Sequence, residues 1–179
     1  MNPKNIYSTL LLGNNFDYVL FKAAILFAES GLKVWFISPE TFDKIPENIV
    51  APEKEILQLI TFLYLKDYKE LISHLNGIHL WHKVPDVVIL PNLEIYCNLH
   101  SDKYDPLLSA LIVTALVDST SVCAKKNQRA YLIATCSISP ENCENRLQIL
   151  HDMYFPHVVR ESEENETLLK DIVDYYLNN

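Results

Sequence analysis

Hydrophobic residues in this chain form two kinds of run, short continuous ones and longer ones with helical periodicity. Ser8 to Gly13 is a continuous apolar run that stops at a glycine and predicts a strand, while Tyr18 to Glu29 is an apolar stretch long enough for a helix. Between them, Asn14 to Asp17 has the residue types of a turn. Lys33 to Ser38 predicts a second strand. This order predicts a right-handed βαβ unit with parallel strands.

The same two patterns continue to the end of the chain. Continuous runs predict strands at Ile56–Tyr64, Val87–Leu90 and Arg129–Cys136, and a further extended segment at Tyr154–Arg160. Helical patterns follow Asp67 as far as Ile78 and also cover Pro106–Lys125, Glu141–Met153 and Leu168–Leu177. The segments Pro39–Pro52 and Asn92–Asp105 predict loops, the second with Leu93 and Tyr96 turned inwards. The alternation predicts an α/β fold whose mostly parallel sheet carries helices on both faces.

Composition narrows the class of protein. With 179 residues, of which 49% are hydrophobic, the chain is long enough for one globular domain with a sizeable core. Its 15 Lys and Arg residues against 23 Asp and Glu residues give a net charge of −8, the wrong sign for a protein that coats nucleic acid unaided. No signal-peptide pattern opens the chain and no apolar run is judged to reach membrane length, so we expect no membrane association.

The cysteines indicate neither a disulfide framework nor a zinc site. Cys97, Cys123, Cys136 and Cys143 are widely spaced and form no C-x-x-C pair. We therefore expect reduced, buried thiols.

The loop after the first predicted strand has the setting of a phosphate-binding P-loop without its chemistry. A P-loop follows the pattern G-x-x-x-x-G-K-[S/T], in which the lysine contacts the phosphates and the hydroxyl contacts Mg²⁺. Here Gly13 takes the first position, but Tyr18, Val19 and Leu20 stand in place of the second glycine, the lysine and the hydroxyl residue. The degenerate loop comprises Gly13, Asn14, Asn15, Phe16, Asp17, Tyr18, Val19 and Leu20. Asp17 adds negative charge where a phosphate would otherwise bind.

The second metal-organising group of such sites is degenerate too. A Walker-B acid should follow four apolar strand residues, but Pro91 follows Val87–Leu90, and Asp86 lies at the opposite end of that strand. Glu40, just past the second strand, stands where such folds place a water-activating carboxylate. Without a lysine or a metal-binding acid beside it, Glu40 is interpreted as a remnant or a loop cap.

Other candidate chemistry is weaker. His74, His79 and His82 gather near the end of the predicted helix that follows Asp67, where a solvated helix end is favoured over a metal site. No G-x-S-x-G or G-x-G-x-x-G motif occurs. The main basic cluster is Lys125, Lys126 and Arg129, a candidate contact for a nucleic-acid backbone but too small to form a binding surface by itself.

Several segments, taken in order, resemble one family. They are Leu10-Leu11-Leu12-Gly13, Ala23–Ala28, Ile60–Tyr64, Val88–Tyr96, Leu111–Asp118 and Ile149–Pro156. Together they resemble the ATPase SWIM-domain-associated proteins, the recombinase-paralogue half of the Shu complex. The resemblance covers roughly Leu10 to Pro156 and implies a RecA-like P-loop fold. It also implies a partner with a zinc-binding SWIM domain, nuclear localisation and a role in homologous recombination, where the pair binds single-stranded DNA and promotes assembly of a RecA-type recombinase.

The chain departs from that family's pattern at the nucleotide site, at Tyr18, Val19, Leu20 and Pro91. We therefore expect a pseudo-ATPase subunit without catalytic residues, bound ATP, Mg²⁺ or another metal. Residues 1–160 are expected to form a single RecA-like core, and residues 161–179 an acidic hinge and a C-terminal helix on or beside it. The apolar helices Tyr18–Glu29 and Pro106–Lys125 are the candidates to meet the partner.

Two other functions fit the same predicted fold. One is a small α/β enzyme whose substrate lies at the carboxyl ends of the strands, with Glu40, Asn92, Glu94 and Asp118 as candidate residues. The other is an adaptor with an unrelated partner.

Overall fold

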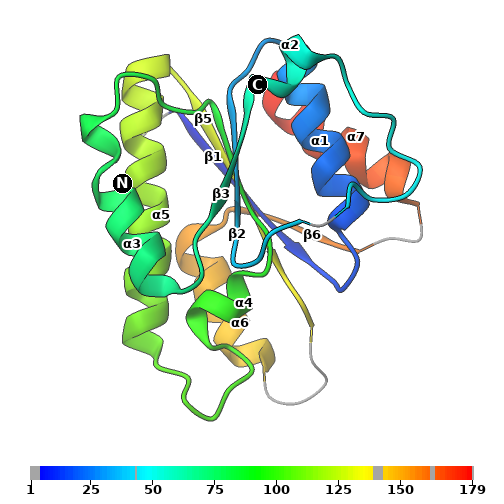
Figure 1. Ribbon diagram of the computed structural model, residues 1–179. Coiled ribbons are helices and arrows are strands. Elements are labelled where there is room, and N and C mark those ends of the chain that lie inside the picture. The colour runs from blue at the N-terminus through cyan, green and yellow to red at the C-terminus, as the bar shows by residue number, and fades with distance from the viewer. Residues whose placement is uncertain (1–4, 43, 139–142, 162–163, 179) are drawn as a thin grey trace.

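The strands form one six-stranded parallel sheet. The computed structural model describes residues 5–42, 44–138, 143–161 and 164–178. The strands lie in the order β3-β2-β4-β5-β1-β6, and every neighbouring pair is parallel (Figure 1). They are β1 (Ile6–Leu12), β2 (Val34–Ser38), β3 (Ile60–Tyr64), β4 (Val87–Leu90), β5 (Ala130–Cys136) and β6 (His157–Arg160). Because they are parallel, their carboxyl ends meet at one edge of the sheet.

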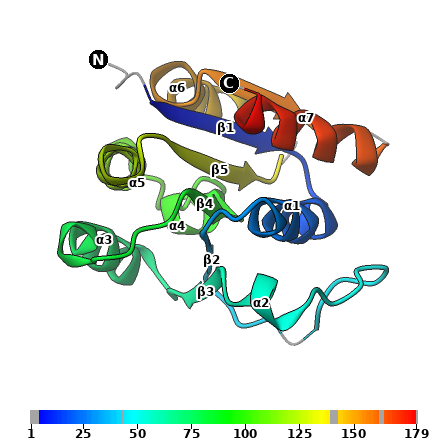
Figure 2. The same cartoon turned by 90° about the horizontal axis from the view of Figure 1, so that it is seen from above.

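Helices cover both faces of this sheet. Figure 2 shows α1 and α7 on one side and α3, α5 and α6 on the other. The helices are α1 (Asp17–Glu29), α2 (Lys54–Leu57), α3 (Tyr68–Asn76), α4 (Leu93–Cys97), α5 (Pro106–Asn127), α6 (Cys143–Tyr154) and α7 (Asn165–Leu177), with the 3-10 helix η1 (Ile78–Leu80). The predicted α/β fold, with its parallel sheet and helices on both faces, is confirmed.

Two predicted element starts are confirmed by their caps. The carboxylate of Asp67 accepts hydrogen bonds from the backbone N–H groups of Lys69, at 2.8 Å, and Glu70, at 3.0 Å, at the start of α3. Asp105 caps α5 in the same way, and Pro106 takes the first helical position as predicted.

Three predicted segments need correction. Ile56 and Leu57 belong to α2 and not to a strand, because β2 begins at Val34, whose partner is Ile60, and residues before Ile60 have no ladder to join. Tyr154 ends α6, and the extended segment begins only after Pro156, at His157. The predicted loop at Asn92–Asp105 contains α4, although Leu93 and Tyr96 are buried as expected. The predicted start of α6 at Glu141 lies outside the described residues.

Helix α1 is enclosed between the sheet and α7. Its buried side chains are Val19, Leu20, Phe21, Ala23, Ala24, Ile25, Phe27 and Ala28. From the other side α7 contributes Leu168, Ile172 and Tyr176 to the same core, and the rings of Tyr176 and Tyr131 stack with centroids 5.0 Å apart. Enclosure of α1 contradicts the expectation that its apolar face meets a partner, because α7 already covers that face.

Helix α5 is apolar over much of its surface but only half buried. Contrary to the expectation that no apolar run reaches membrane length, α5 has the length and composition of a membrane-spanning segment. This is weak evidence for a membrane span, because core helices of globular proteins share both properties. Ile112, Val113 and Leu116 pack against the sheet, whereas Leu107 is 81% exposed and Leu111 is 53% exposed. One stripe of α5 therefore belongs to the core, and the described part of the chain leaves another uncovered.

The buried thiols and phenols predict that alkali destabilises the fold. Burial raises the pKa of the Cys97 and Cys123 thiols from 9.0 to about 12, and that of the Tyr176 phenol from 10.0 to about 12. Above about pH 9 the unfolded chain releases these protons while the folded chain keeps them. The unfolded state then binds fewer protons, so the free energy of unfolding falls as pH rises, by up to about 1.4 kcal/mol per pH unit for each group.

Urea unfolding followed by circular dichroism between pH 7.5 and 11.5 measures this slope. The Cys97→Ala and Cys123→Ala variants should each show a shallower decline above pH 9 than the unmodified chain. A free energy of unfolding that stays constant from pH 8 to pH 11 would contradict the prediction.

Candidate functional site

The degenerate loop is a short connection at the carboxyl edge of the sheet. It runs from Gly13 to Phe16, between the last residue of β1 and the first of α1. The backbone N–H of Gly13 donates to the carbonyl of Cys136 on β5 at 3.1 Å, and the Phe16 carbonyl accepts from the N–H of Leu20 at 2.8 Å. Phe16 itself is buried. The loop is therefore held close to the sheet end, with little room for the wide turn of a P-loop.

A carboxylate of the chain already lies in this loop. Oε2 of Glu161 accepts a hydrogen bond from the backbone N–H of Asn14 at 2.8 Å, and the N–H of Glu161 donates to the carbonyl of Leu12 at 2.8 Å. A backbone N–H at the start of a helix is the group that a phosphate would use. Glu161 thus takes a donor that a nucleotide would need, and it adds negative charge beside Asp17.

Glycine at position 13 is required by this close approach. A Cβ atom on Gly13 would overlap with Cβ and Oε2 of Glu161 and would lie 2.9 Å from Cζ of Phe16. Gly13 leaves room for Glu161, the residue that follows β6, whereas the first glycine of a P-loop leaves room for a phosphate.

The P-loop positions for lysine and hydroxyl lie in the core. Val19 is 0% exposed and Leu20 is 1% exposed, and both pack between α1 and the sheet. Tyr18, at the position of the second glycine, is half-buried, and its hydroxyl donates to Oε1 of Glu166 at the start of α7, at 3.0 Å. This hydrogen bond is the main reason that the pKa of Tyr18 is raised. Side chains at these three positions therefore pack inwards or tie α1 to α7.

The Walker-B position also lacks a carboxylate. Pro91 is buried after β4, and the next residue, Asn92, adopts a left-handed backbone with φ of 57° while its N–H donates to Oγ1 of Thr135 at 3.0 Å. Glu94, in the first turn of α4, is 8% exposed, and its Oε2 has no hydrogen-bond partner among the described residues.

Three of the four residues proposed for a small-molecule enzyme follow neighbouring strands, and the fourth lies elsewhere. Glu40 is exposed after β2, and Asn92 and Glu94 follow β4, which pairs with β2 at ~4.8 Å per strand. Asp118 is exposed on α5, about 18 Å along the helix from Pro106 towards the opposite edge. Its predicted place at the carboxyl ends is therefore wrong, because α5 runs back along the sheet.

The basic cluster lies at the amino ends of the strands, away from the degenerate loop. Nζ of Lys126 donates to the carbonyl of Trp81 at 2.6 Å, and Nη1 of Arg129 donates to the carbonyl of Tyr176 at 3.2 Å. The Arg129 guanidinium also lies 4.6 Å from the Tyr176 ring centroid. Two of the three predicted cations are thus partly engaged within the chain, while Lys125 is exposed.

Sequence reasoning missed the residues that surround this cluster. Lys33, Lys83 and the indole of Trp81 line a pocket of about 330 Å³ beside β2 and β3. Trp81 is 41% exposed and packs edge-to-face against the buried Trp35, with centroids 5.2 Å apart. The sequence feature that could have identified them is that Lys33, Trp81 and Lys83 all lie at or before the start of a predicted strand. The starts of parallel strands meet at one edge of the sheet.

The histidines and cysteines form no metal site in the described part of the chain. His74 packs between Trp35 and Trp81, with ring centroids 5.1 and 5.2 Å away, and burial lowers its pKa. Cys97, Cys123 and Cys136 are buried and reduced, as expected, while the side chain of Cys143 lies outside the described residues.

Comparison of the sequence with protein-family models and with curated proteins gives no match. Solved structures do resemble the fold. The RadB recombinase aligns with a TM-score of 0.60 at 12% identity, over 88% of this chain and 76% of that one. The flagellar accessory protein FlaH from Methanocaldococcus jannaschii aligns with a TM-score of 0.51 at 11% identity, over 87% and 70%. At these identities the likeness shows the fold alone, and the chain has a RecA-like P-loop fold.

The contact between Gly13 and Glu161 predicts coupled effects on stability. Gly13→Ala should lower the free energy of unfolding by about 1–3 kcal/mol through overpacking. Glu161→Gly should lower it by about 1 kcal/mol through the lost hydrogen bond. In the double variant the alanine meets no Glu161 side chain, so its cost should shrink, with a coupling of at least about 0.5 kcal/mol in urea unfolding.

An exposed carboxylate elsewhere on the same sheet edge provides the control. Glu40→Gly, combined with Gly13→Ala, should give additive losses. Additive losses for the Gly13 and Glu161 pair would mean that the Glu161 side chain does not lie in the loop.

Proposed function

We propose that this chain is a non-catalytic RecA-like subunit, a pseudo-ATPase that pairs with a SWIM-domain zinc protein in a Shu-type complex. The pair binds single-stranded DNA in the nucleus and promotes assembly of a RecA-type recombinase filament during homologous recombination repair. One observation carries the proposal: within a RecA-like fold, the carboxylate of Glu161 takes a backbone N–H of the degenerate nucleotide loop. The likeness to a recombinase supports the process, and the sequence resemblance supports the particular complex.

The loop geometry argues against tight binding of ATP and Mg²⁺. A lysine must extend from the start of the helix to the phosphates, but the corresponding side chain, Val19, points into the core. Asp17 and Glu161 place negative charge at the helix end that would otherwise attract phosphate. Pro91 supplies no carboxylate for the metal. In this proposal the subunit works as a scaffold and no ATP is hydrolysed.

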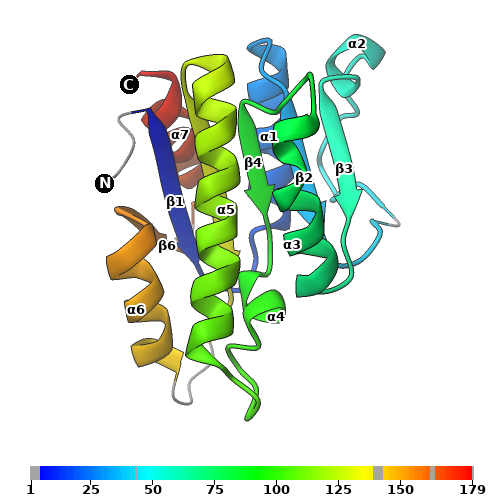
Figure 3. The same cartoon turned by 90° about the vertical axis from the view of Figure 1, so that its left-hand side faces the viewer.

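The α5–α6 patch is the surface that we assign to the SWIM-domain partner. It consists of Leu107 and Leu111 on α5 and Ile149 and Met153 on α6, which are 81%, 53%, 53% and 65% exposed. The two helices stand side by side in Figure 3. Oγ1 of Thr114, on the same face of α5 as Leu111, donates to the hydroxyl of Tyr154 on α6 at 3.1 Å. Exposed apolar side chains that none of the described residues covers are typical of an interface.

The amino-end surface is the contact that we assign to single-stranded DNA. It consists of Lys33, Trp81, Lys83, Lys125 and Lys126. An exposed indole offers a stacking face for a base, and neighbouring ammonium groups offer partners for the backbone. Because the net charge of the chain is −8, the partner should supply the other phosphate contacts.

Co-expression with a SWIM-domain protein from the same organism tests the proposal. Size-exclusion chromatography should give a stable one-to-one complex, and millimolar ATP with Mg²⁺ should leave its melting temperature unchanged. A monomer that does not bind the SWIM protein would exclude the Shu-type assignment, and a clear ATP-dependent rise in melting temperature would exclude the pseudo-ATPase.

Charge introduced into the α5–α6 patch should separate the two proteins. Leu111→Glu with Met153→Glu should abolish co-elution because both carboxylates would lie unpaired in an apolar interface. Val50→Glu, at a residue that is 84% exposed elsewhere, is the matched control and should co-elute normally. Equal co-elution of both variants would place the interface on another face.

Single-stranded DNA binding by the complex tests the amino-end surface. Trp81→Ala should weaken binding to an oligo-dT probe by roughly 5- to 150-fold, the loss expected for about 1–3 kcal/mol of base stacking. Lys83→Gln should weaken it and reduce the salt dependence by about one phosphate contact. Fluorescence anisotropy over a salt series measures both effects.

Lys170→Gln, at an exposed residue of α7, is the control and should bind like the unmodified complex. Thermal melts establish that Trp81→Ala remains folded. Unchanged affinity in both the Trp81 and Lys83 variants would place the DNA contact outside this surface.

A further inference from the structure

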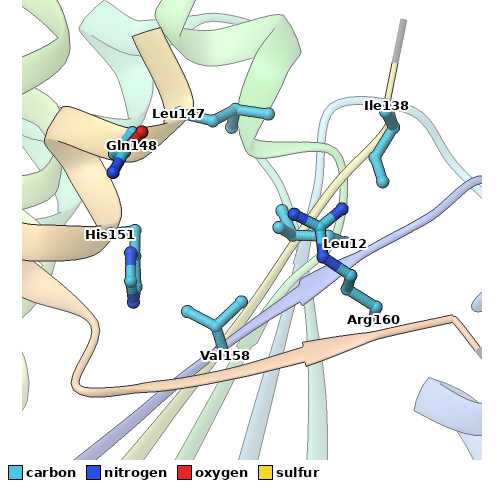
Figure 4. Close-up of a pocket in the computed structure, with 7 residues that line it drawn as sticks. All are labelled: Leu12, Ile138, Leu147, Gln148, His151, Val158 and Arg160. Carbon is cyan, nitrogen blue, oxygen red and sulfur yellow. The ribbon is translucent and has the colours of Figure 1, made fainter. Parts of the chain in front are cut away.

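A second pocket lies at the carboxyl edge, on the face of β1 opposite to the Gly13 loop. It measures about 380 Å³ and opens between α6 and the ends of β1 and β6 (Figure 4). None of Glu40, Asn92, Glu94 or Asp118 lines it. It also faces away from the α5–α6 patch, because Gln148 and His151 border it while Ile149 and Met153 lie on another side of α6. The pocket therefore belongs to neither surface assigned above.

Arg160 brings a guanidinium to this pocket. Neighbouring residues of a strand point to opposite faces of its sheet, so Val158 and Arg160 face α6 whereas Glu161 turns to the Gly13 loop. Glu161 is thus directed away from the guanidinium beside it. No carboxylate of the described residues pairs with Arg160. Figure 4 shows its guanidinium at the opening, in front of Leu12.

Two further polar side chains face the opening from α6. In Figure 4, Gln148 and His151 lie on the wall opposite Arg160. Nδ1 of His151 contacts Oδ1 of Asp152 at 2.9 Å, which orients the ring and leaves Nε2 for another partner. An amide and a guanidinium that can donate hydrogen bonds therefore face one opening, together with an imidazole whose Nε2 accepts a hydrogen bond in the neutral ring and donates one in the protonated ring.

The walls of the pocket are apolar. Leu12 and Leu147 are buried, and Val158 and Ile138 are half-buried beside them. An inorganic anion would pair with Arg160 but leave the apolar walls exposed to water. A neutral hydrocarbon would cover the walls but hold the guanidinium against apolar atoms without a partner. A ligand that satisfies both parts carries an acceptor group on an apolar body, and the volume suits a small molecule.

We propose that this pocket binds a small organic acid. The carboxylate pairs with the forked donors of Arg160, and the apolar body packs against Leu12, Leu147 and Val158. A guanidinium fork donates to two oxygens of a carboxylate or of a phosphate alike. The single positive charge of Arg160 balances the single negative charge of a carboxylate but not the charge of about −1.5 to −2 on a phosphate monoester, which favours a carboxylate at a site with one arginine. The inference does not depend on the proposed role in recombination, since the two use different surfaces.

Binding of 3-phenylpropionate to the full chain tests the proposal. Titrations followed by two-dimensional amide NMR should show shifts at residues 147–151 and 158–160. The affinity for 3-phenylpropionate should exceed that for 3-phenylpropionamide, acetate and phenyl phosphate by roughly tenfold or more. Equal binding of the amide, of acetate or of phenyl phosphate would overturn the assignment, because the site would then not select a carboxylate on an apolar body.

Two exposed positions provide the variants. Arg160→Gln should weaken binding of 3-phenylpropionate by roughly tenfold or more. Gln148→Trp should block the opening and abolish binding while the melting temperature stays unchanged. Lys170→Gln, on the other side of the sheet, is the control and should bind normally. Unchanged affinity in Arg160→Gln or Gln148→Trp would show that the acid binds elsewhere.

Discussion

The enclosure of α1 between the sheet and α7 is the constraint on which the carboxyl edge depends. Over its first turns this helix leaves only Asp17, Tyr18 and Lys22 partly or fully exposed, so Val19 and Leu20 serve packing instead of ligand chemistry. The same arrangement places the residue after β6 and the first turn of α7 beside the start of α1. The hydrogen bonds of Glu161 to Asn14 and of Glu166 to Tyr18 follow from that placement.

Much of the fold could be predicted from local pattern. The strand–helix–strand unit at the start, the central strand Val87–Leu90 and the long helix from Pro106 were readable because continuous apolar runs, capping residues and helix-starting prolines act locally. The extent of β3 was not readable, since the residues before Ile60 lack a partner only because β2 begins at Val34. Strand length in a parallel sheet is set by a neighbour far away in the sequence.

The sequence predicted which nucleotide-binding residues the candidate site lacks, but it did not predict which side chain the loop contacts instead. Tyr18, Val19, Leu20 and Pro91 could be identified by position against a known motif. Glu161 could not, because it reaches Asn14 through the pairing of β1 with β6 across most of the chain length. In the sequence Glu161 is one of four glutamates within residues 161–166, and no local feature distinguishes it from the other three. Lys33, Lys83 and Trp81 were missed for the same reason, since only the sheet brings them together.

The two edges of the sheet also differ in charge. Lys33, Lys83 and the cluster at the end of α5 gather at the amino ends of the strands, while Asp17, Glu161 and Glu166 gather around the start of α1. A net charge of −8 averages over this separation. Overall charge therefore describes how the chain behaves at long range, and local charge describes which edge an anion would approach.

The hydrogen bond from Asn14 to Glu161 makes the loop's acceptor part of the same molecule. A tethered group of this kind acts at an effective concentration on the order of millimolar or higher, whatever the solution contains. A free phosphate would have to compete with a ligand that never diffuses away. In the proposed pseudo-ATPase, the state of this loop is therefore set when the chain folds and does not follow the supply of nucleotide around it.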